Sequence, residues 1–211
     1  MTRNDYKIEN SGSNQGLIVG ENKGNIEISI KNVVRIPSLI SAVVKSLGEV
    51  CSSDDIESTF DSKEFKPDEK IEYNYVIKYK DIIRYFSAYY SICEGYLNAY
   101  DDSNMRGKAK ILNCIYSWYM KERGTILLEN KDSGREDIDI IRQNSDKIID
   151  MVQDKIFEIV KATNEIDIMY IEDMELGVTC FTCYCFMECK ILEKPLWLWM
   201  LNVNRIDLYI I

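Results

Sequence analysis

Four cysteines near the end of the chain have a spacing that could bind a metal. Cys180, Cys183, Cys185 and Cys189 form a C-x2-C-x-C-x3-C pattern, and four thiolates can hold zinc or an iron–sulfur cluster. The apolar character of residues 172–191, however, predicts a helix. On a helix Cys183 lies about 60° from Cys180, whereas Cys185 and Cys189 lie roughly 140–180° away. The four sulfurs therefore cannot converge, and we expect buried, reduced thiols, no bound metal and no cofactor.

Histidine is absent from the whole chain. Its absence excludes Ser-His-Asp and Cys-His catalysis and histidine-ligated metal sites. The pair Glu188-x-Lys190 resembles the acid–lysine pair of restriction-type nucleases, but such pairs act from a strand, and on a helix the two side chains diverge by about 200°. The chain also has neither a G-x-x-x-x-G-K-[ST] nor a G-x-G-x-x-G phosphate-binding loop. We therefore expect no catalytic residues; an enzyme that uses cysteines or carboxylates is the less favoured alternative.

The overall charge and hydropathy argue against nucleic acids and membranes as direct partners. The 211 residues include 26 Lys and Arg against 35 Asp and Glu, which gives a formal charge of -9. Such a chain repels phosphates unless its basic residues cluster, and no dense cluster occurs. The longest apolar stretch, Val178–Met187, is far shorter than the ~20 residues that span a bilayer. Seven cysteines without an apolar leader favour a cytoplasmic location with reduced thiols.

Apolar residues that recur at steps of three and four predict helices along most of the chain. The expected fold class is mainly α, an antiparallel helical bundle over residues 67–195. A short helix and a polar linker precede it at 36–66, and an apolar tail follows at 196–211. The tail, LWLWML at its start, is expected to fold back or to bind a partner. Within the bundle the periodicity predicts a long helix in residues 67–101, either continuous or preceded by a short first helix at 68–74, and further helices at 105–122, 138–162 and 172–191. The last of these is the most apolar and should be buried on most sides.

The first 35 residues predict a small β-hairpin. An Asn-x-Gly triplet recurs between short β-branched runs in residues 10–30, which is typical of tight turns between strands. A lone hairpin is marginally stable, so it must pack against its own domain or against the same segment of another subunit. For the second case, oligomerisation through the hairpin, the candidate interface residues are Leu17, Val19, Ile26 and Ile28.

Two segments of the predicted bundle resemble a known family. The first is FKPDEKIEYNYVIKYKDIIRYFSAYYSICEGYLNAY at Phe65–Tyr100, with its EKIEYN core at Glu69–Asn74, and the second is FMECKILEKP at Phe186–Pro195. Together they resemble the C-terminal domain of ABC-three-component conflict systems, the Lamassu-like antiphage loci. In that family the helical domain usually follows an effector on the same chain and couples it to an SMC-like ABC ATPase. Here the first 60 residues contain no effector domain, and the tail after Pro195 does not match the family.

The resemblance implies a non-enzymatic regulatory or adaptor subunit of an SMC-like ABC ATPase antiphage system, with the ATPase and an effector subunit as partners. Lys70, Tyr73 and Asn74 share one helix face, and Lys190 lies where a helix C-terminus favours a cation. We take these four residues as hypothetical partner-binding residues. The same residues could instead serve only as caps and corners of the bundle. A stand-alone homo-oligomeric scaffold is the alternative function.

Overall fold

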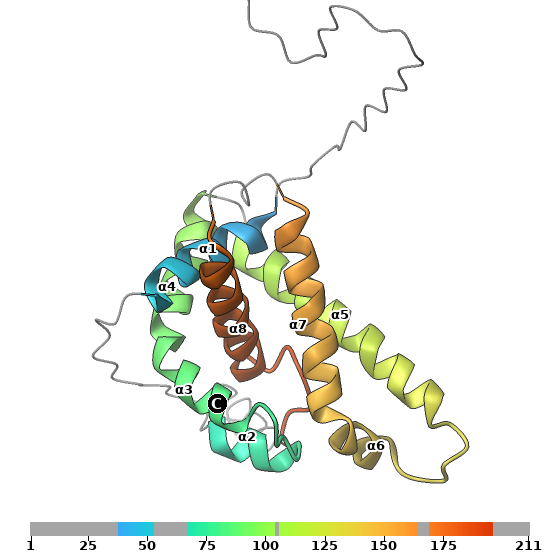
Figure 1. Ribbon diagram of the computed structural model, residues 1–211. Coiled ribbons are helices and arrows are strands. Elements are labelled where there is room, and N and C mark those ends of the chain that lie inside the picture. The colour runs from blue at the N-terminus through green and yellow to red at the C-terminus, as the bar shows by residue number, and fades with distance from the viewer. Residues whose placement is uncertain (1–37, 53–66, 104–105, 164–168, 196–211) are drawn as a thin grey trace, which may run out of the picture. The chain divides into compact units, whose positions relative to one another are not determined.

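The computed structural model describes residues 38–52, 67–103, 106–163 and 169–195. This part of the chain is mainly helical and contains no strand (Figure 1). None of its helices is both long and apolar enough to cross a membrane. The predicted hairpin, with Leu17, Val19, Ile26 and Ile28, and the tail at 196–211 lie outside the described residues. In chain order the elements are α1 (Leu39–Cys51), α2 (Pro67–Tyr73), α3 (Lys80–Phe86), the short 3-10 helix η1 (Ser87–Tyr89), α4 (Tyr90–Ser103), α5 (Gly107–Glu129), α6 (Asp137–Gln143), α7 (Ser145–Lys161) and α8 (Ile171–Met187).

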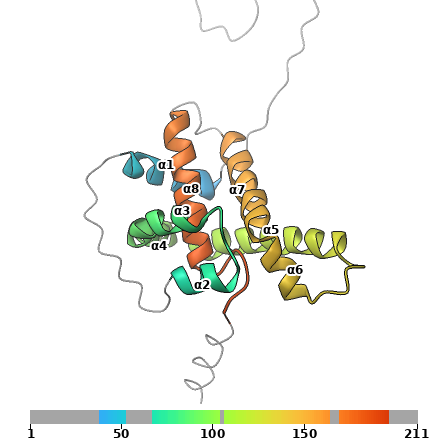
Figure 2. The same cartoon turned by 60° about the horizontal axis from the view of Figure 1, so that its bottom comes forward.

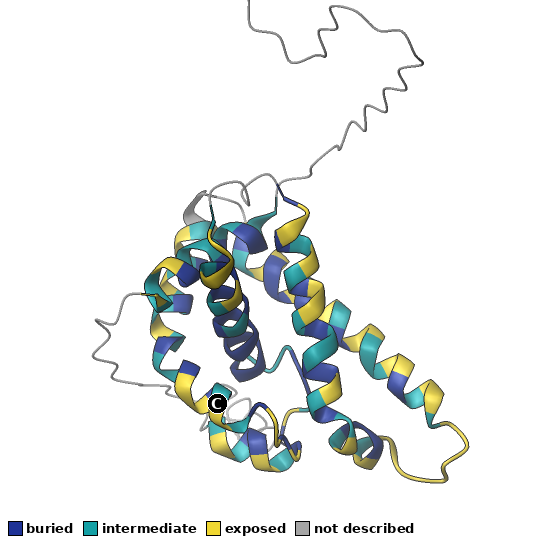
Figure 3. Cartoon of the chain, in the orientation of Figure 1, coloured by how far each residue is buried: buried dark blue, intermediate teal, exposed yellow. Residues whose placement is uncertain are grey.

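Helix α8 forms the centre of the bundle. It packs against α1, α7 and α3, and it runs in the direction opposite to α7 (Figure 1). All its residues from Cys180 to Met187 are buried, as the dark blue of its lower half shows in Figure 3. A helix with apolar residues on every side must be surrounded by others to remove that surface from water. The prediction that the last helix is buried on most sides is confirmed.

The backbones of α1 and α8 are in direct contact where the two helices cross. Each helix has a glycine at the crossing, and each glycine faces the backbone of the other helix. A Cβ atom placed on Gly177 of α8 would lie 2.1 Å from the carbonyl oxygen of Val44 in α1. A Cβ atom on Gly48 of α1 would lie 2.1 Å from the carbonyl oxygen of Asp173 in α8. Only glycine fits at such positions, since a methyl group would push the two backbones apart. The helix predicted within 36–66 is therefore packed directly into the core of the bundle.

The stretch 67–101 begins with the short first helix that the sequence allowed at 68–74, and the structure also divides the long helix predicted after it. Helix α2 ends at Tyr73, and Tyr75 takes a left-handed conformation with φ 54°. The backbone N–H of Val76 then donates to the carbonyl of Ile71 at 3.0 Å, and that of Tyr75 donates to Glu72 at 3.2 Å. These two bonds form a Schellman motif, which terminates a helix. After the turn the chain continues as α3, η1 and α4, so a 3-10 segment interrupts even the remaining part.

The pattern at 138–162 is likewise divided, into α6 and α7. Asn144 between them has φ -114° and ψ 15°, outside the helical region. Its side-chain amide donates to the carbonyl of Ile140 at 2.8 Å. That bond satisfies an acceptor at the end of α6 and stabilises the break.

Asp146, in the first turn of α7, binds the backbone at the start of α3. Its carboxylate accepts hydrogen bonds from the N–H groups of Ile77 at 3.0 Å, Lys78 at 3.0 Å and Tyr79 at 3.4 Å. The three N–H groups lie in the turn that leads into α3. The Asp146 carboxylate therefore caps this turn from a distant helix.

We expect Asp146→Ala to lower the free energy of unfolding by about 1–2 kcal/mol, because it removes this cap. Urea unfolding followed by circular dichroism measures the change. Asp154→Ala, two turns further along α7, is the matched control, because Asp154 is exposed; it should change stability by less than about 0.5 kcal/mol. Equal losses in the two variants would contradict the capping role.

Candidate functional site

The two segments that resemble the family meet in the folded chain. Helix α2, which contains most of Glu69–Asn74, lies beside the C-terminal end of α8 and the segment that follows it (Figure 2). We call this contact the junction, formed by Glu69–Asn74 and Phe186–Pro195. Hydrogen bonds between residues 116 to 121 positions apart hold it together. The two segments are therefore parts of one structural site.

Lys70 is the buried centre of the junction. Its side chain has no exposed surface, and its ammonium donates to the carbonyl oxygens of Phe186 at 2.6 Å and Ile191 at 2.7 Å. The ammonium also lies 4.4 Å from the centre of the Phe186 ring, within range of a cation–π interaction. Because Phe186 belongs to the last turn of α8, the ammonium lies at the negative end of that helix, where a cation is favoured.

Burial lowers the pKa of Lys70 to about 8. Removing the ammonium from water disfavours its charged form. The nearby sulfur of Cys189 and the carboxylate of Glu193 act in the opposite direction and limit the decrease of the pKa. The charge is thus held mainly by carbonyl groups and a sulfur atom, with a carboxylate only nearby.

Asn74 closes the junction from the other side. Its side-chain amide donates to the carbonyls of Lys70 at 3.0 Å and Glu193 at 2.9 Å. Its side-chain oxygen accepts from the N–H of Glu193 at 3.0 Å. The buried amide therefore pairs with both backbone groups of one residue, as a neighbouring strand would. This reciprocal pair fixes the direction in which the chain leaves the bundle.

The turn after α8 brings its carbonyls back toward Lys70. Cys189 and Leu192 have left-handed φ angles of 53° and 64°. The N–H of Lys190 donates to the carbonyl of Cys185 at 2.9 Å, and that of Cys189 donates to Phe186 at 3.1 Å. These bonds form a second Schellman motif. Each segment of the junction thus contains the end of a helix, and both helices end in the same type of turn.

A cleft of about 460 Å³ lies at the outer side of the junction, lined by Tyr73, Arg123, Glu136, Asp137, Ile138, Glu193 and Lys194. Helix α5 supplies two of the groups that hold Glu193: the Tyr119 hydroxyl donates to its carboxylate at 2.9 Å and Arg123 at 2.7 Å. Burial and the neighbouring carboxylate of Glu193 raise the pKa of Tyr119, so its hydroxyl stays a donor. The cleft therefore has rigidly held walls of mixed charge.

Arg142, from α6, fixes the remaining wall. It donates to the carbonyl of Tyr73 at 2.7 Å, and its guanidinium lies 4.3 Å from the centre of the Tyr73 ring. A stacked arginine of this kind holds an aromatic ring in one orientation. The Tyr73 side chain is thus held at the edge of the cleft.

The four residues taken as partner-binding occupy three different environments. Lys70 and Asn74 are fully buried and contact the second segment; Tyr73 is half-buried and lines the cleft. Lys190 is half-buried at the end of α8 and is not part of the cleft wall. A partner at this site would therefore contact Tyr73, while Lys70 and Asn74 maintain the shape behind it. The binding role of all four stays a prediction.

Sequence reasoning did not identify the residues that complete the cleft. Arg123 and Arg142 come from α5 and α6, in stretches without any motif. Glu193 lies inside the FMECKILEKP segment, so that segment already contained the signal for it. The two arginines carried no such signal, because their contacts are made only when distant helices pack together.

The cysteines lie apart from the junction, except for Cys185 and Cys189. The sulfur of Cys180 in α8 lies 3.6 Å from that of Cys93 in α4, and the Cys180 thiol together with burial raises the pKa of Cys51 in α1. Burial raises the pKa of the Cys183 and Cys185 thiols, which keeps them protonated. All seven cysteines are free thiols. In the four described stretches, no group of three or more potential ligands is placed to hold a metal ion.

The polar groups inside the junction, on Lys70 and Asn74, already form hydrogen bonds within the protein. The groups that face outward are a phenol, a guanidinium, carboxylates and the exposed ammonium of Lys194. This mixture suits contacts with the polar side chains and backbone of another protein. Comparisons with protein-family models, with curated proteins and with solved structures find no match to this chain.

Proposed function

We propose that this chain is a non-enzymatic adaptor, the regulatory subunit of a cytoplasmic SMC-like ABC ATPase antiphage system. In this role it couples the ATPase to an effector subunit through protein–protein contacts. The observation that supports the proposal is the junction itself. The two segments that resemble the family lie 116 or more positions apart, yet Lys70 and Asn74 join them through buried hydrogen bonds.

The buried network of the junction would suit an adaptor because it holds the binding surface in one arrangement. A buried ammonium is costly unless its donors are satisfied, so the Lys70 network specifies one arrangement of α2 and the segment after α8. Binding surfaces require side chains whose positions are locked by their supporting contacts. The cleft walls formed by Tyr73, Arg123 and Glu193 have this support.

Co-expression of the full chain with an SMC-like ATPase and an effector subunit from the same genome tests the proposal. We expect the tagged chain to co-purify with the ATPase. The double variant Tyr73→Ala with Lys194→Glu should weaken that binding at least about tenfold, because it removes an anchor and reverses a charge at the cleft. Lys110→Glu, an exposed position at the opposite end of α5, is the charge control and should bind as the wild type does.

Two results would contradict the proposal, the first its adaptor role and the second the cleft as the binding site. One is the absence of ATPase from material in which the wild-type chain is folded and abundant. The other is equal loss of binding in the cleft variant and in Lys110→Glu, which would indicate a general charge effect. A uniform homo-oligomer in light scattering, together with no ATPase binding, would favour the scaffold alternative.

A further inference from the structure

Helix α8 exposes one face between α3 and α7, and a cleft lies on each side of it. The cleft toward α3 measures about 500 Å³, and Ile82, Phe86 and Leu176 form its apolar wall. The cleft toward α7 measures about 300 Å³ and includes Phe157 and Val178. Glu175 and Thr179 line both clefts. The two clefts therefore flank a single ridge of α8, and we call the ridge and its clefts the α8 groove.

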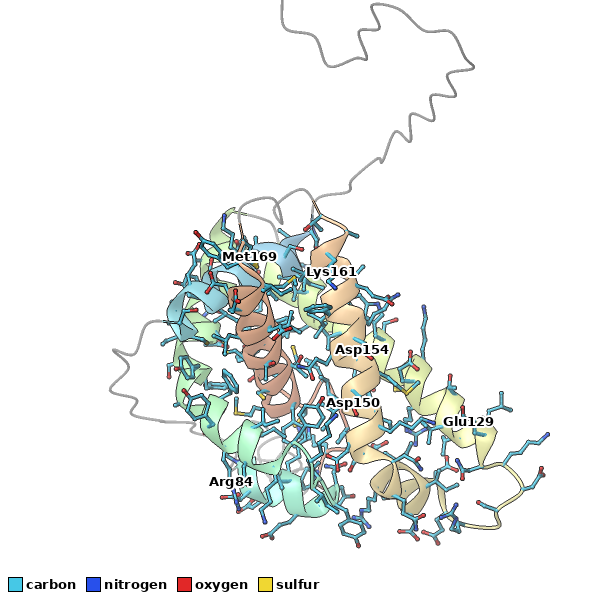
Figure 4. All side chains as sticks on the ribbon, in the orientation of Figure 1. Arg84, Glu129, Asp150, Asp154, Lys161 and Met169 are labelled. Carbon is cyan, nitrogen blue, oxygen red and sulfur yellow. The ribbon has the colours of Figure 1, made fainter. Side chains whose placement is uncertain are left out.

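Three carboxylates surround the α8 groove. Glu172 and Glu175 lie on the ridge, and Asp154 lies on the facing side of α7; Figure 4 shows Asp154 one turn beyond Asp150. All three are exposed, and no described cation forms an ion pair with any of them. The groove thus combines apolar walls with a negative rim whose charge is not neutralised by the described residues.

Two cations on the neighbouring helices, Arg84 and Lys155, are already paired with other carboxylates. In α3, Arg84 pairs with Asp68 at 2.7 Å and with Asp81 at 3.3 Å. In α7, Lys155 pairs with Glu158 at 2.9 Å. The ammonium of Lys161 lies 4.2 Å from the centre of the Phe157 ring, so one wall of the groove already attracts a cation.

Lys78 also forms an ion pair, because its ammonium lies 2.5 Å from the carboxylate of Asp150. The negative charge that remains at the groove is therefore that of Asp154, Glu172 and Glu175, with Lys161 as the nearby cation. A positively charged partner would gain from this rim, and a negatively charged one would be repelled.

Exposed apolar side chains extend the α8 groove at both edges. Ile171, one turn before Glu175 on the ridge, is 49% exposed. Tyr85 of α3 is 64% exposed, and its ring meets the Phe86 ring edge-on at 5.1 Å between centres. Exposed apolar surface that adjoins a cleft and carries a charged rim is characteristic of protein interaction sites.

We infer that the α8 groove binds a basic amphipathic helix of a protein partner. Apolar side chains on one face of that helix, spaced by three and four residues, would enter the two clefts beside the ridge. Its lysines or arginines would contact Asp154, Glu172 and Glu175. The inference deepens the proposed adaptor function, on which it rests, by assigning a chemical class of partner segment to a surface separate from the junction.

The test uses the purified full chain and a fluorescently labelled peptide made of leucine and lysine. The peptide has about 18 residues, five helical turns, with its leucines placed on one face. Fluorescence anisotropy measures the dissociation constant. A reordered peptide of the same composition and charge, without an apolar face, is the peptide control. We expect the amphipathic peptide to bind at least about tenfold more tightly than the reordered one.

Two pairs of charge reversals locate the site. Glu172→Lys with Glu175→Lys should weaken binding of the amphipathic peptide by about tenfold or more. Glu129→Lys with Asp132→Lys changes the net charge by the same amount at the far end of α5, where Figure 4 shows Glu129; it should change binding less than about threefold. The exposed variant Ile171→Ser tests the apolar contribution and should also weaken binding, without disturbing the core.

Equal binding of the two peptides, or equal effects of the two charge reversals, would overturn the inference, because general acidity would then explain the interaction. Peptide binding that appears only after removal of residues 196–211 would instead assign the groove to the chain's own tail. The assay contains no ATPase, so its outcome does not depend on the adaptor function. Tyr73→Ala with Lys194→Glu should leave peptide binding unchanged, which separates the α8 groove from the junction.

Discussion

Lys70→Met is expected to lower the free energy of unfolding by about 3 kcal/mol. Methionine fills a similar volume, but it cannot donate to the carbonyls of Phe186 and Ile191, which Lys70 binds at 2.6 and 2.7 Å. The Ile191 carbonyl then loses its donor, whereas the Phe186 carbonyl keeps the N–H of Cys189 at 3.1 Å. A buried acceptor left without a donor costs roughly 1–3 kcal/mol. Lys190→Met is the matched control. Its side chain is half-buried and is not held by a comparable network, so its loss should stay below about 0.5 kcal/mol.

The pH dependence of this difference gives a second readout. Burial lowers the pKa of Lys70 from 10.5 in the unfolded chain to about 8 in the folded protein. Between about pH 8 and pH 10.5 the unfolded state therefore binds a proton that the folded state has released, so the contribution of Lys70 to stability rises with pH in this window. Below pH 8 both states bind the proton and this pH dependence disappears.

Wild type should accordingly gain stability relative to Lys70→Met as the pH rises, by on the order of 1 kcal/mol between about pH 8 and pH 9. Taking the difference between the two proteins removes the effect of the buried thiols and tyrosines, whose raised pKa values act in the opposite direction. Urea unfolding at several pH values measures it. A difference that is constant or shrinks over this range would contradict a lowered pKa of Lys70.

The parts of the fold that depend on local periodicity were predictable from the sequence. The helical character of residues 67–195 follows from apolar residues at steps of three and four, and the central position of α8 follows from its lack of a polar side. Apart from the end of the short first helix near residue 74, the helix breaks were not predicted. Asp146 caps the start of α3 from nearly 70 positions away, and a contact of this range leaves no trace in a local pattern.

The junction shows the same limit. Glu69–Asn74 and Phe186–Pro195 were identified as distinct segments, but a lysine is expected at the surface. Lys70 is buried only because the turn after α8 places two carbonyls and a sulfur around it. Backbone acceptors carry no sequence signature. The residue types therefore located the segments but left open whether their side chains contact a partner or only form caps and corners of the bundle.

Gly177→Ala is expected to destabilise the protein by about 2–3 kcal/mol. The new methyl carbon would lie 2.1 Å from the carbonyl oxygen of Val44 and 3.0 Å from the nitrogen of Gly48. Both atoms belong to the backbone of α1, so the clash is relieved only if α1 moves away from α8. Crowding of this kind in a core costs roughly 1–3 kcal/mol or more, which exceeds the ~1 kcal/mol that alanine gains over glycine within a helix.

Gly124→Ala provides a control with the opposite sign. Gly124 also lies inside a helix, α5, but a Cβ atom there would have no neighbour within 4 Å. Only the helix propensity changes, so this variant should gain up to about 1 kcal/mol. Urea unfolding of both variants measures the two effects. A stabilised Gly177→Ala protein would show that α1 and α8 are not in backbone contact.

The double variant Gly48→Ala with Gly177→Ala tests the geometry further. A Cβ atom on Gly48 would lie 2.1 Å from the carbonyl oxygen of Asp173, so each substitution alone pushes α1 away from α8. Once one methyl group has separated the helices, part of the room for the second already exists. The combined loss should therefore fall short of the sum of the single losses by about 1 kcal/mol or more. Strict additivity would mean that the two glycines do not share one helix–helix contact.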